Sequence, residues 1–325
     1  MAVINLLTAI NQALDQKMAE DPTVIVYGED AGYEGGVFRV TAGLQKKYGE
    51  ERVFDTPISE AAITGNAVGM AINGLRPVAE IQFDGFVFAG YTEIVTHMAR
   101  YRNRSRGRYG LPIVVRFPVG GGIRALEHHS ESLETFMGHI PGLKVVIPST
   151  PYDAKGLLIS AIEDPDPVIY MEPKRIYRSG KQEVPEEIYR IPIGKAKVVQ
   201  PGSDITVVAW GAMVREAEKA IKLLENENIS VELIDLRTIN PIDEEAIIQS
   251  VQKTGRFLVV QEAVKTYGPG AELMSLVNEK AFLYLEAPPT RVTGFDITVP
   301  LARGEMHHFV QPERIAAEIK KVVRF

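Results

Sequence analysis

Two short stretches of this sequence could do chemistry, and the first holds a single carboxylate, Glu60, after the turn-like residues FDTPIS (54–59). A long run of small and apolar residues follows it, AAITGNAVGMAING (61–74). One explanation is structural, because a carboxylate in the first turn of a helix gains about 0.3–1 kcal/mol from the helix dipole. The other is chemical, because small residues admit a flat ligand and a poorly solvated carboxylate suits a hydrogen bond to a ring nitrogen. Spacing alone favours the structural explanation.

The second stretch is EHHSES (127–132), which contains the adjacent histidines His128 and His129. Histidine is the side chain best suited to proton transfer near neutral pH. Neighbouring side chains in a loop point to different sides, so we expect no more than one of the pair to face a site. A surface network of His, Ser and Glu is the alternative, and the residues alone do not decide. A metal site is not favoured, because no ligand spacing links this pair to the other histidines, His97, His139, His307 and His308.

Glycine-rich stretches occur at 30–38 (DAGYEGGVF) and 119–123 (VGGGI). Either could bring backbone N–H groups close to an anion or a cofactor ring. Neither has the G-x-G-x-x-G pattern of a dinucleotide site or the lysine of a phosphate-binding loop. A plain turn is therefore the favoured explanation for each stretch.

Composition excludes several classes of protein. The 325 residues include no cysteine and carry a net charge of −6. Thiol nucleophiles and thiolate metal sites are therefore excluded, and the G-x-S-x-G elbow of a serine hydrolase is absent. The negative charge argues against a nucleic-acid partner, and the basic stretch YRNRSRGR (101–108) is better explained as a solvated helix end or a subunit contact. No stretch has the form of a signal peptide or of a membrane span, so we expect a cytoplasmic protein without a membrane partner.

The elements that must position these residues alternate between β-rich runs and helical patterns, which predicts an α/β fold with two parallel-sheet domains. In the first half we expect strands at 23–28, 76–83, 111–117, 143–149 and 166–172, with helices at 59–73, 87–102 and 150–164. In the second half we expect strands at 204–211, 229–236, 256–262 and 290–294, with helices at 212–227, 242–254, 269–280 and 312–323. Thr150 is the expected N-cap of its helix and Pro151 the first helical residue. Proline and charge enrichment predicts a linker at 186–203 between domains at 1–185 and 204–325.

Taken in order, several segments resemble one known family across essentially the whole chain. They are GEDAGYEGGVFRVTAGLQKKYGEERVFDTPISE (28–60), GLRPVAEIQF (74–83), HHSES (128–132), PGLKVVIPSTPYDAKGLL (141–158), DPVIYMEPKRIYR (166–178), PGSDITVVAWG (201–211), IDLRTINPID (234–243), KTGRFLVVQEA (253–263) and EAPPTRVTGFD (286–296). The family is that of the β subunits of the thiamine-diphosphate-dependent, decarboxylating first component of 2-oxo acid dehydrogenase complexes.

The resemblance implies a transketolase-like pyrimidine-binding domain at 1–185 and a transketolase C-terminal-type domain at 204–325. It also implies an α2β2 heterotetramer, in which the α subunit holds Mg²⁺ and the diphosphate through G-D-G and N-N motifs. This chain contains neither motif. We therefore expect thiamine diphosphate to bind between the two chains, and the β chain alone to be inactive.

The resemblance also assigns roles to individual residues. Glu60 matches the glutamate that hydrogen-bonds the aminopyrimidine ring and favours its imino tautomer. Phe86 matches the aromatic residue that packs against this ring, with Ile58 and Gln82 as its neighbours. His129 matches the histidine that exchanges protons during reductive acylation of a lipoyl group, whereas His128 is an atypical neighbour.

Two further features are implied only by the resemblance. Backbone carbonyls near Ile113, Ala161, Asp164 and Asp166 are expected to hold a structural K⁺, since carbonyl oxygens suit a hard cation. The C-terminal residues KKVVRF (320–325) match a tail that helps to dock the lipoyl acyltransferase component.

The implied function is the oxidative decarboxylation of a 2-oxo acid, with acyl transfer to the acyltransferase. The segments EPKRIYR and GSDITVVAWG slightly favour a branched-chain substrate, with pyruvate close behind. Two alternatives remain, a transketolase-type thiamine enzyme acting on sugar phosphates and a non-catalytic assembly subunit.

Overall fold

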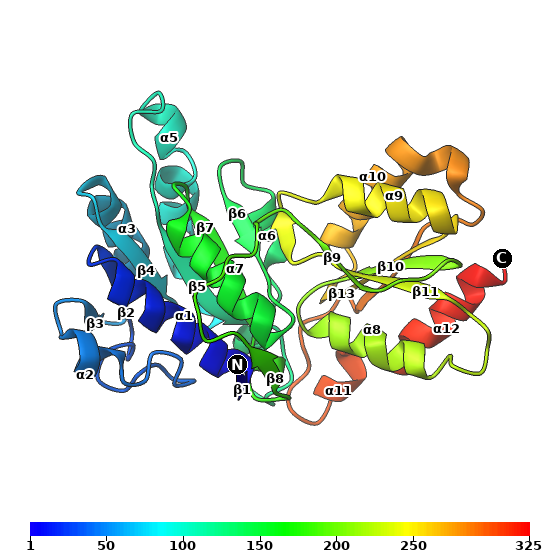
Figure 1. The fold of residues 1–325 in the computed structure, drawn as a ribbon, viewed down its shortest axis with the longest axis horizontal. Coiled ribbons are helices and arrows are strands. Elements are labelled where there is room, and N and C mark those ends of the chain that lie inside the picture. Colours follow the sequence, from blue (N-terminus) through cyan, green and yellow to red (C-terminus); the bar gives the residue numbers. More distant parts are fainter.

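The protein consists of two α/β domains side by side along its long axis, and the computed structural model describes all of residues 1–325 (Figure 1). A seven-stranded sheet forms the N-terminal domain and a five-stranded sheet the C-terminal domain. Most neighbouring strands in both sheets run parallel, which confirms the predicted fold class. None of the helices combines the length and the apolar character that a membrane crossing requires.

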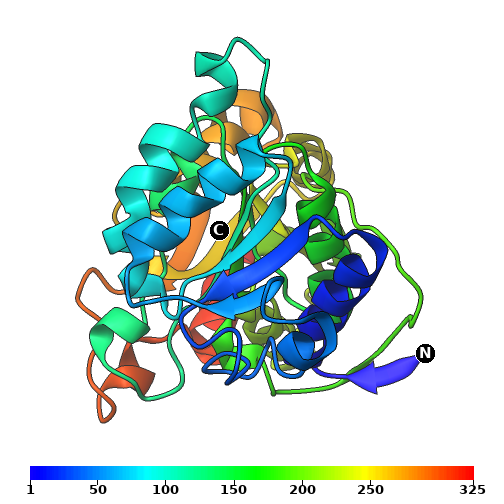
Figure 2. The ribbon, with the colours of Figure 1, turned by 90° about the vertical axis from the view of Figure 1, so that its left-hand side faces the viewer.

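The N-terminal sheet has the strand order β12-β6-β7-β5-β4-β2-β3. Its strands are β2 (Val24–Gly28), β3 (Val53–Asp55), β4 (Arg76–Glu80), β5 (Val114–Val119), β6 (Lys144–Val146), β7 (Val168–Pro173) and β12 (Thr238–Asn240). Because successive side chains of a strand point to opposite faces, Val24 and Val26 join the apolar cluster of α1 (Leu6–Glu20) and α7 (Pro151–Glu163). Ile25 and Tyr27 join the cluster of α3 (Glu60–Ile72) on the other face. Figure 2 shows the sheet between these two helical layers.

Shorter elements complete the N-terminal domain. They are β1 (Ala2–Ile4), which pairs with β8 (Gln182–Val184), the helices α2 (Leu44–Tyr48), α4 (Val87–Glu93), α5 (Tyr101–Arg104) and α6 (Glu134–Gly138), the π-helical turn η2 (Ile94–Met98), and the 3-10 turns η1 (Asp84–Phe86), η3 (Glu127–His129) and η4 (Lys174–Ile176). The sequence predicts one helix at 87–102, whereas the structure divides this range among α4, η2 and α5.

The C-terminal sheet has the order β14-β13-β10-β11-β9, with only β9 antiparallel to its neighbour. Its strands are β9 (Lys197–Gln200), β10 (Ile205–Ala209), β11 (Val231–Asp235), β13 (Phe257–Val264) and β14 (Thr290–Gly294). The helices are α8 (Ala212–Lys222), α9 (Glu244–Thr254), α10 (Pro269–Ala281), α11 (Glu305–His308) and α12 (Pro312–Val323), with the 3-10 turn η5 (Phe282–Tyr284) after α10. Buried residues of α8 and α12 share one apolar cluster, and those of α9 and α10 share the other, so both faces are covered.

Two strands tie the domains together. β9 lies inside the segment expected to be a linker (186–203) and forms the edge of the C-terminal sheet. β12 follows β11 in the chain but pairs with β6, so the C-terminal half of the sequence contributes an edge strand to the N-terminal sheet. The exact domain boundaries at 185 and 204 remain a prediction.

Sequence signals for the start of α7 are confirmed. Thr150 is its N-cap and accepts a hydrogen bond from the backbone N–H of Asp153 at 3.1 Å, with Pro151 in the first turn. A side-chain oxygen at this position satisfies one of the donors that a helix leaves open at its start.

Candidate functional site

The segments that carry the predicted site residues follow strands that all end at one edge of the N-terminal sheet. Gly28, the last residue of β2, lies opposite both Asp55 at the end of β3 and Glu80 at the end of β4. Glu80 in turn lies opposite Arg116 of β5. Loops that follow the carboxyl ends of neighbouring parallel strands share one edge, where α/β proteins commonly bind ligands. The loops that carry Glu60, Phe86 and His129 therefore converge there.

Glu60 is the first residue of α3, and its carboxylate makes no hydrogen bond and no ion pair within the chain. Helix α4 packs close to it, since a Cβ added at Gly90 would lie 2.8 Å from the Glu60 carbonyl oxygen. A second carboxylate, Glu29, follows β2 directly, is 5% exposed, and has a buried Oε1 without a partner. Burial raises the pKa of Glu29, and the charges of Glu60 and Asp30 raise it further. Two nearby carboxylates thus face this edge without a compensating cation.

The imidazole ring of His129 packs against two aromatic rings, those of Phe83 and Phe86. Its ring centroid is 4.1 Å from that of Phe83 and 5.2 Å from that of Phe86. Burial lowers the pKa of His129, and the charges of His128 and Lys174 lower it further. Its Nδ1 is buried and has no hydrogen-bond partner. His129 is therefore a neutral imidazole at neutral pH, with a ring nitrogen free to bind a ligand or to exchange a proton.

A buried ion pair fixes the segment that carries Phe83 and Phe86. The Lys174 Nζ lies 2.7 Å from Asp84 Oδ2, and both side chains are fully buried. Burial raises the pKa of Asp84 to about 7, although the Lys174 cation opposes this shift. Glycine at position 85 allows η1 to contact η3, because an added Cβ would lie 2.2 Å from the His128 carbonyl oxygen. The Lys174–Asp84 ion pair therefore fixes the segment that carries Phe83 and Phe86. The close backbone contact at Gly85 holds this segment against the one that carries His129.

The remaining predicted cofactor residues occupy the same edge. Gln82 follows β4, and its Nε2 donates a 2.7 Å hydrogen bond to Asp30 Oδ2, so it joins the loop after β4 to the loop after β2. Ile58 is 86% exposed, which leaves a large apolar side chain uncovered two residues before Glu60. The histidine neighbour, His128, is half-exposed and its ring centroid lies 4.3 Å from that of His129.

Four residues of this arrangement were not predicted from the sequence: Glu29, Phe83, Asp84 and Lys174. Glu29 could have been found from the sequence, because it directly follows the buried strand expected at 23–28, at the end where ligands commonly bind. Asp84 and Lys174 are 90 positions apart, and nothing in the local pattern of either residue points to the other.

The two glycine-rich stretches serve the fold. In the first, a Cβ added at Gly35 would lie 2.5 Å from the Ala42 Cα. In the second, the N–H groups of Gly121 and Gly122 each donate a 2.8 Å hydrogen bond, to Glu262 Oε1 and Glu305 Oε1. These donors are thus used by carboxylates of the C-terminal domain rather than left open for an anion.

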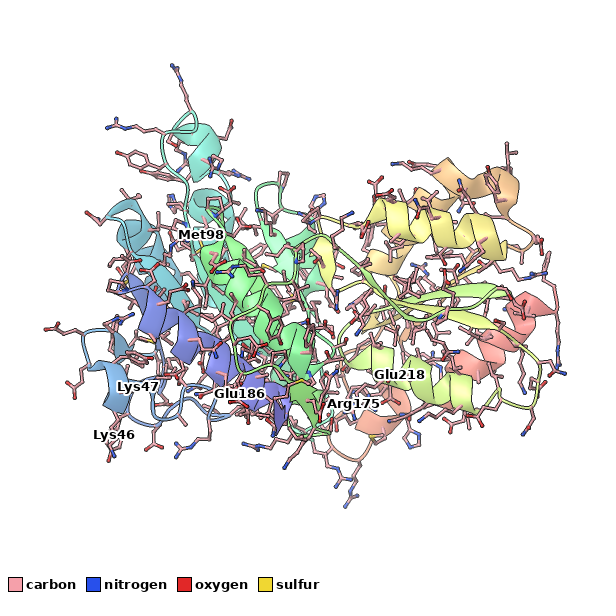
Figure 3. The ribbon with its side chains drawn as sticks, in the orientation of Figure 1. Lys46, Lys47, Met98, Arg175, Glu186 and Glu218 are labelled. Atoms are coloured by element: carbon pink, nitrogen blue, oxygen red, sulfur yellow. The ribbon has the colours of Figure 1, made fainter.

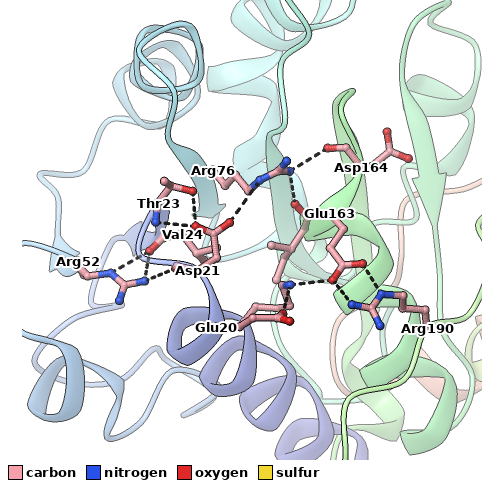
Figure 4. A network of polar contacts seen from close by, with 11 residues as sticks. Glu20, Asp21, Thr23, Val24, Arg52, Arg76, Glu163, Asp164 and Arg190 are labelled. Carbon is pink, nitrogen blue, oxygen red and sulfur yellow. Dashed lines mark hydrogen bonds and ion pairs between the residues drawn. The ribbon is translucent and has the colours of Figure 1, made fainter.

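The region expected to hold K⁺ already contains cationic side chains. The Ile113 carbonyl accepts a hydrogen bond from the Val168 N–H at 2.9 Å. The Arg76 guanidinium donates to the carbonyls of Ile162 at 2.8 Å and Asp164 at 3.4 Å (Figure 4). A K⁺ ion at these carbonyls would compete with the Arg76 guanidinium, and the K⁺ assignment to Ile113, Ala161, Asp164 and Asp166 remains a prediction.

Comparison with known proteins agrees with this architecture. Residues 2–180 match the family described as transketolase, pyrimidine binding domain, and residues 194–315 match transketolase, C-terminal domain. The solved structure entitled "Split gene transketolase, inactive beta4 tetramer" shares the fold, with a TM-score of 0.81 at 22% identity and 99% of each chain covered.

Two curated relatives match over their full length. The pyruvate dehydrogenase E1 component subunit beta of Acholeplasma laidlawii is 72% identical over 324 residues, covering 100% of this chain and 99% of the relative. The subunit of the same name from Bacillus subtilis (strain 168) is 49% identical over 325 residues, covering 100% of both. The chain therefore belongs to the family of β subunits of the thiamine-diphosphate-dependent first component of 2-oxo acid dehydrogenase complexes.

Proposed function

We propose that this chain is the β subunit of a pyruvate-type first component. Together with an α subunit, it decarboxylates pyruvate oxidatively and acetylates the lipoyl group of the acyltransferase component. The names of the relatives support pyruvate. They do not favour the branched-chain substrate that the sequence segments slightly favoured, nor the alternative of a sugar-phosphate enzyme.

One observation carries the proposal: the unpartnered carboxylate of Glu60 lies at the sheet edge where the loops that carry Phe86 and His129 also begin. Thiamine diphosphate, when bound, supplies the carbanion chemistry that decarboxylation requires. The Glu60 carboxylate would accept a hydrogen bond from the ring nitrogen of the pyrimidine. Phe86 would pack against the same ring. Once an α subunit covers this open edge, the Glu60 charge would be screened less by water and would stabilise its partner more than it does in water.

His129 would serve the second half of the reaction. Its neutral imidazole can accept a proton and return it while the acyl group passes to the lipoyl sulfur. Its ring is held by Phe83 and Phe86, so its position relative to the pyrimidine depends on the same loop. Proton transfer at a fixed distance is most effective when the group is already oriented.

The cofactor residues lie at an open edge, which supports a site completed by an α subunit. Ile58 and the first residues of α3 after Glu60 are exposed. A cavity of about 730 Å³ exists between the domains, but it is lined by residues such as Phe136, Ile239 and Tyr267 and not by Glu60 or His129. The α subunit would also hold Mg²⁺ and the diphosphate, for which this chain has no G-D-G or N-N motif.

Co-expression with candidate α subunits tests the function. Thiamine diphosphate and Mg²⁺ are titrated into the purified β chain and into the mixed complex, and decarboxylation is measured with pyruvate, a branched 2-oxo acid and a sugar phosphate. We expect cofactor binding and pyruvate turnover only in the complex. Tight binding and turnover by the β chain alone would overturn the shared site, and a preference for the branched acid would overturn the substrate.

A further inference from the structure

The loop that carries His129 is attached to the C-terminal domain. This loop, residues 120–133, connects β5 to α6 and contains η3. Near its start, Gly121 donates a hydrogen bond to Glu262 of β13, and Gly122 donates one to Glu305, the first residue of α11. The Arg124 N–H approaches the same oxygen of Glu305 at 3.4 Å. Two carboxylates of one domain thus bind successive backbone amides of a loop in the other.

These two carboxylates have no other strong partner. Neither Glu262 nor Glu305 forms an ion pair, and Glu305 is only 2% exposed. Burial raises the pKa of Glu262, while the hydrogen bond from Gly121 and the charges of Arg175 and Lys174 oppose this shift. A buried carboxylate without a cation in direct contact is costly unless it accepts hydrogen bonds. The amides of the loop therefore satisfy the charges of Glu262 and Glu305, and the two carboxylates in turn fix the loop.

Glycine is required on the loop side of this contact. A Cβ at Gly121 would lie 2.1 Å from the Phe309 Cζ, and one at Gly122 would lie 2.9 Å from the Arg175 Cδ. Arg175, which stands near the junction of the domains in Figure 3, reaches into the C-terminal domain, where it contacts Glu216 and lies over the Phe309 ring. The backbone of the loop thus packs closely against Arg175 of the N-terminal domain and Phe309 of the C-terminal domain.

The far end of the loop is attached as well. Glu134, the first residue of α6, is buried and accepts a 3.1 Å hydrogen bond from Nε1 of Trp210, which follows β10. His129 therefore lies between two attachments to the C-terminal domain, one at 121–124 and one at 134. The middle of the loop contacts Phe83 and Phe86, whereas both of its ends are attached to the C-terminal domain.

We infer that Glu305, together with Glu262, is a positioning residue, through which the C-terminal domain sets the place of His129 for acyl transfer. This inference rests on the proposed function for its catalytic consequence, but the attachment itself does not. The C-terminal domain would then contribute to the reaction directly.

The attachment is tested on the full-length β chain by amide hydrogen exchange over residues 119–126. Glu305→Ala removes the acceptor, so we expect exchange there to rise about tenfold through local opening. Glu305→Gln keeps an acceptor oxygen and should stay within about twofold of the unmodified chain. Glu313→Ala, at an exposed glutamate on α12 that forms no hydrogen bond or ion pair, is the matched control. If the alanine variant does not fold, Glu305→Asp, whose oxygens are drawn back by one methylene group, takes its place.

The catalytic consequence is tested on the complex with an α subunit, by two assays in parallel. We expect Glu305→Ala to lower the kcat of lipoyl acetylation by about ten- to a hundredfold, and decarboxylation with an artificial electron acceptor by less than about threefold. Glu305→Gln should restore most of the acetylation rate.

Equal losses in both assays, or unchanged exchange and unchanged acetylation in Glu305→Ala, would overturn the inference. Absence of 2-oxo acid turnover in the unmodified complex would instead overturn the proposed function. The exchange experiment would still decide whether the loop is attached as the structure has it.

Discussion

Glu60 and Glu29 place two carboxylates close together with no cation between them, an arrangement that is costly for folding alone. Proteins commonly retain such an unfavourable arrangement of charges at sites of binding or catalysis. This arrangement supports the proposal that Glu60 binds a ligand, although spacing alone favoured the helix dipole.

Glu60→Gln should lower 2-oxo acid decarboxylation by the reconstituted complex by about a hundredfold or more, because an amide cannot supply the negative charge that holds a proton on the ring. Steady-state turnover with saturating thiamine diphosphate measures this effect. Glu50→Gln, at an exposed position without a hydrogen bond, is the control. Near-normal turnover in Glu60→Gln would remove Glu60 from the mechanism.

His129→Ala should impair lipoyl acylation more than decarboxylation with an artificial acceptor, since only the former needs the imidazole as proton carrier. The pKa of His129 is lowered from 6.5, so the neutral form persists below that pH and is lost only on further acidification. The acid limb of the acylation rate should therefore lie below pH 6.5. His97→Ala, at a surface histidine, should leave both rates unchanged, whereas an equal loss in both assays of His129→Ala would contradict the acyl-transfer role.

Sequence reasoning found the residues whose motifs are local and missed those that depend on distant contacts. Glu60 and His129 stand in short recognisable stretches. The Lys174–Asp84 pair joins residues 90 positions apart, and a single sequence contains no local pattern that reports such a contact. Resemblance to a family compensated for the aromatic residue Phe86, which has no distinctive spacing of its own.

At the scale of elements, helices α1 and α7 lie against each other, and their contact ends in a polar network at Glu163, the last residue of α7 (Figure 4). Its carboxylate accepts hydrogen bonds from Lys17 of α1 at 2.7 Å and from Arg190 at 2.6 and 2.8 Å. Burial raises the pKa of Glu163, but the bonds from Arg190 and Lys17 outweigh it, and the pKa is lowered from 4.5. The network therefore stabilises the fold only while Glu163 is ionised.

Glu163→Gln should lower the free energy of unfolding at pH 7 by about 0.2–1 kcal/mol, the usual range for an ion pair near the surface. A lowered folded-state pKa gives stability that is present above 4.5 and lost as the pH falls through the folded-state value. The difference between Glu163→Gln and the unmodified chain should therefore shrink below pH 4.5. Thermal unfolding across this range measures it, with Glu187→Gln, at an exposed position, as control. A constant difference at all pH values would show that the charge is not responsible.

Element types were predicted well because buried parallel strands are apolar runs of distinct length, as in β2 and β10. The predicted strand at 143–149 is longer than β6, because the chain leaves the sheet after Val146 to reach the N-cap of α7. β9 and β12 were missed because short edge strands depend on their pairing partners, β11 and β6.

At the scale of the whole molecule, the contact between the domains could not be predicted from either half of the sequence. It buries a cluster of charge in which Ser149 donates to Asp235 and the Arg237 side chain pairs with Asp153. Asp153 is fully buried and Asp235 is 1% exposed. Burial raises the pKa of Asp235 to about 7, with a further contribution from the charge of Asp153, while Ser149 and Arg237 oppose the shift.

We therefore expect the stability of the contact between the domains to depend on pH. Because the folded-state pKa of Asp235 lies above its ordinary value of 3.8, its contribution to stability is largest below 3.8 and is lost as the pH rises toward 7. Asp235→Asn keeps an acceptor for the Arg237 N–H and a partner for Ser149, but removes the repulsion from Asp153. We therefore expect the substitution to raise the melting temperature at pH 8 by about 2 °C or more. The gain should be smaller at pH 5, where the native carboxyl is already protonated, and it should vanish only below 3.8, where the carboxyl of the unfolded chain is protonated as well.

Calorimetry on the full-length chain at both pH values decides this prediction, with Glu218→Gln, exposed on α8 (Figure 3), as the control. A lower melting temperature at pH 8 would mean that the Asp235 charge is needed by Arg237 more than it is opposed by Asp153. A change that is the same at both pH values would mean that the substitution acts through packing alone. A gain in melting temperature that is larger at pH 8 than at pH 5 would show that the ionisation of Asp235 weakens the contact between the domains. Because the His129 loop is attached to the C-terminal domain, the same ionisation would then affect how firmly that loop is held.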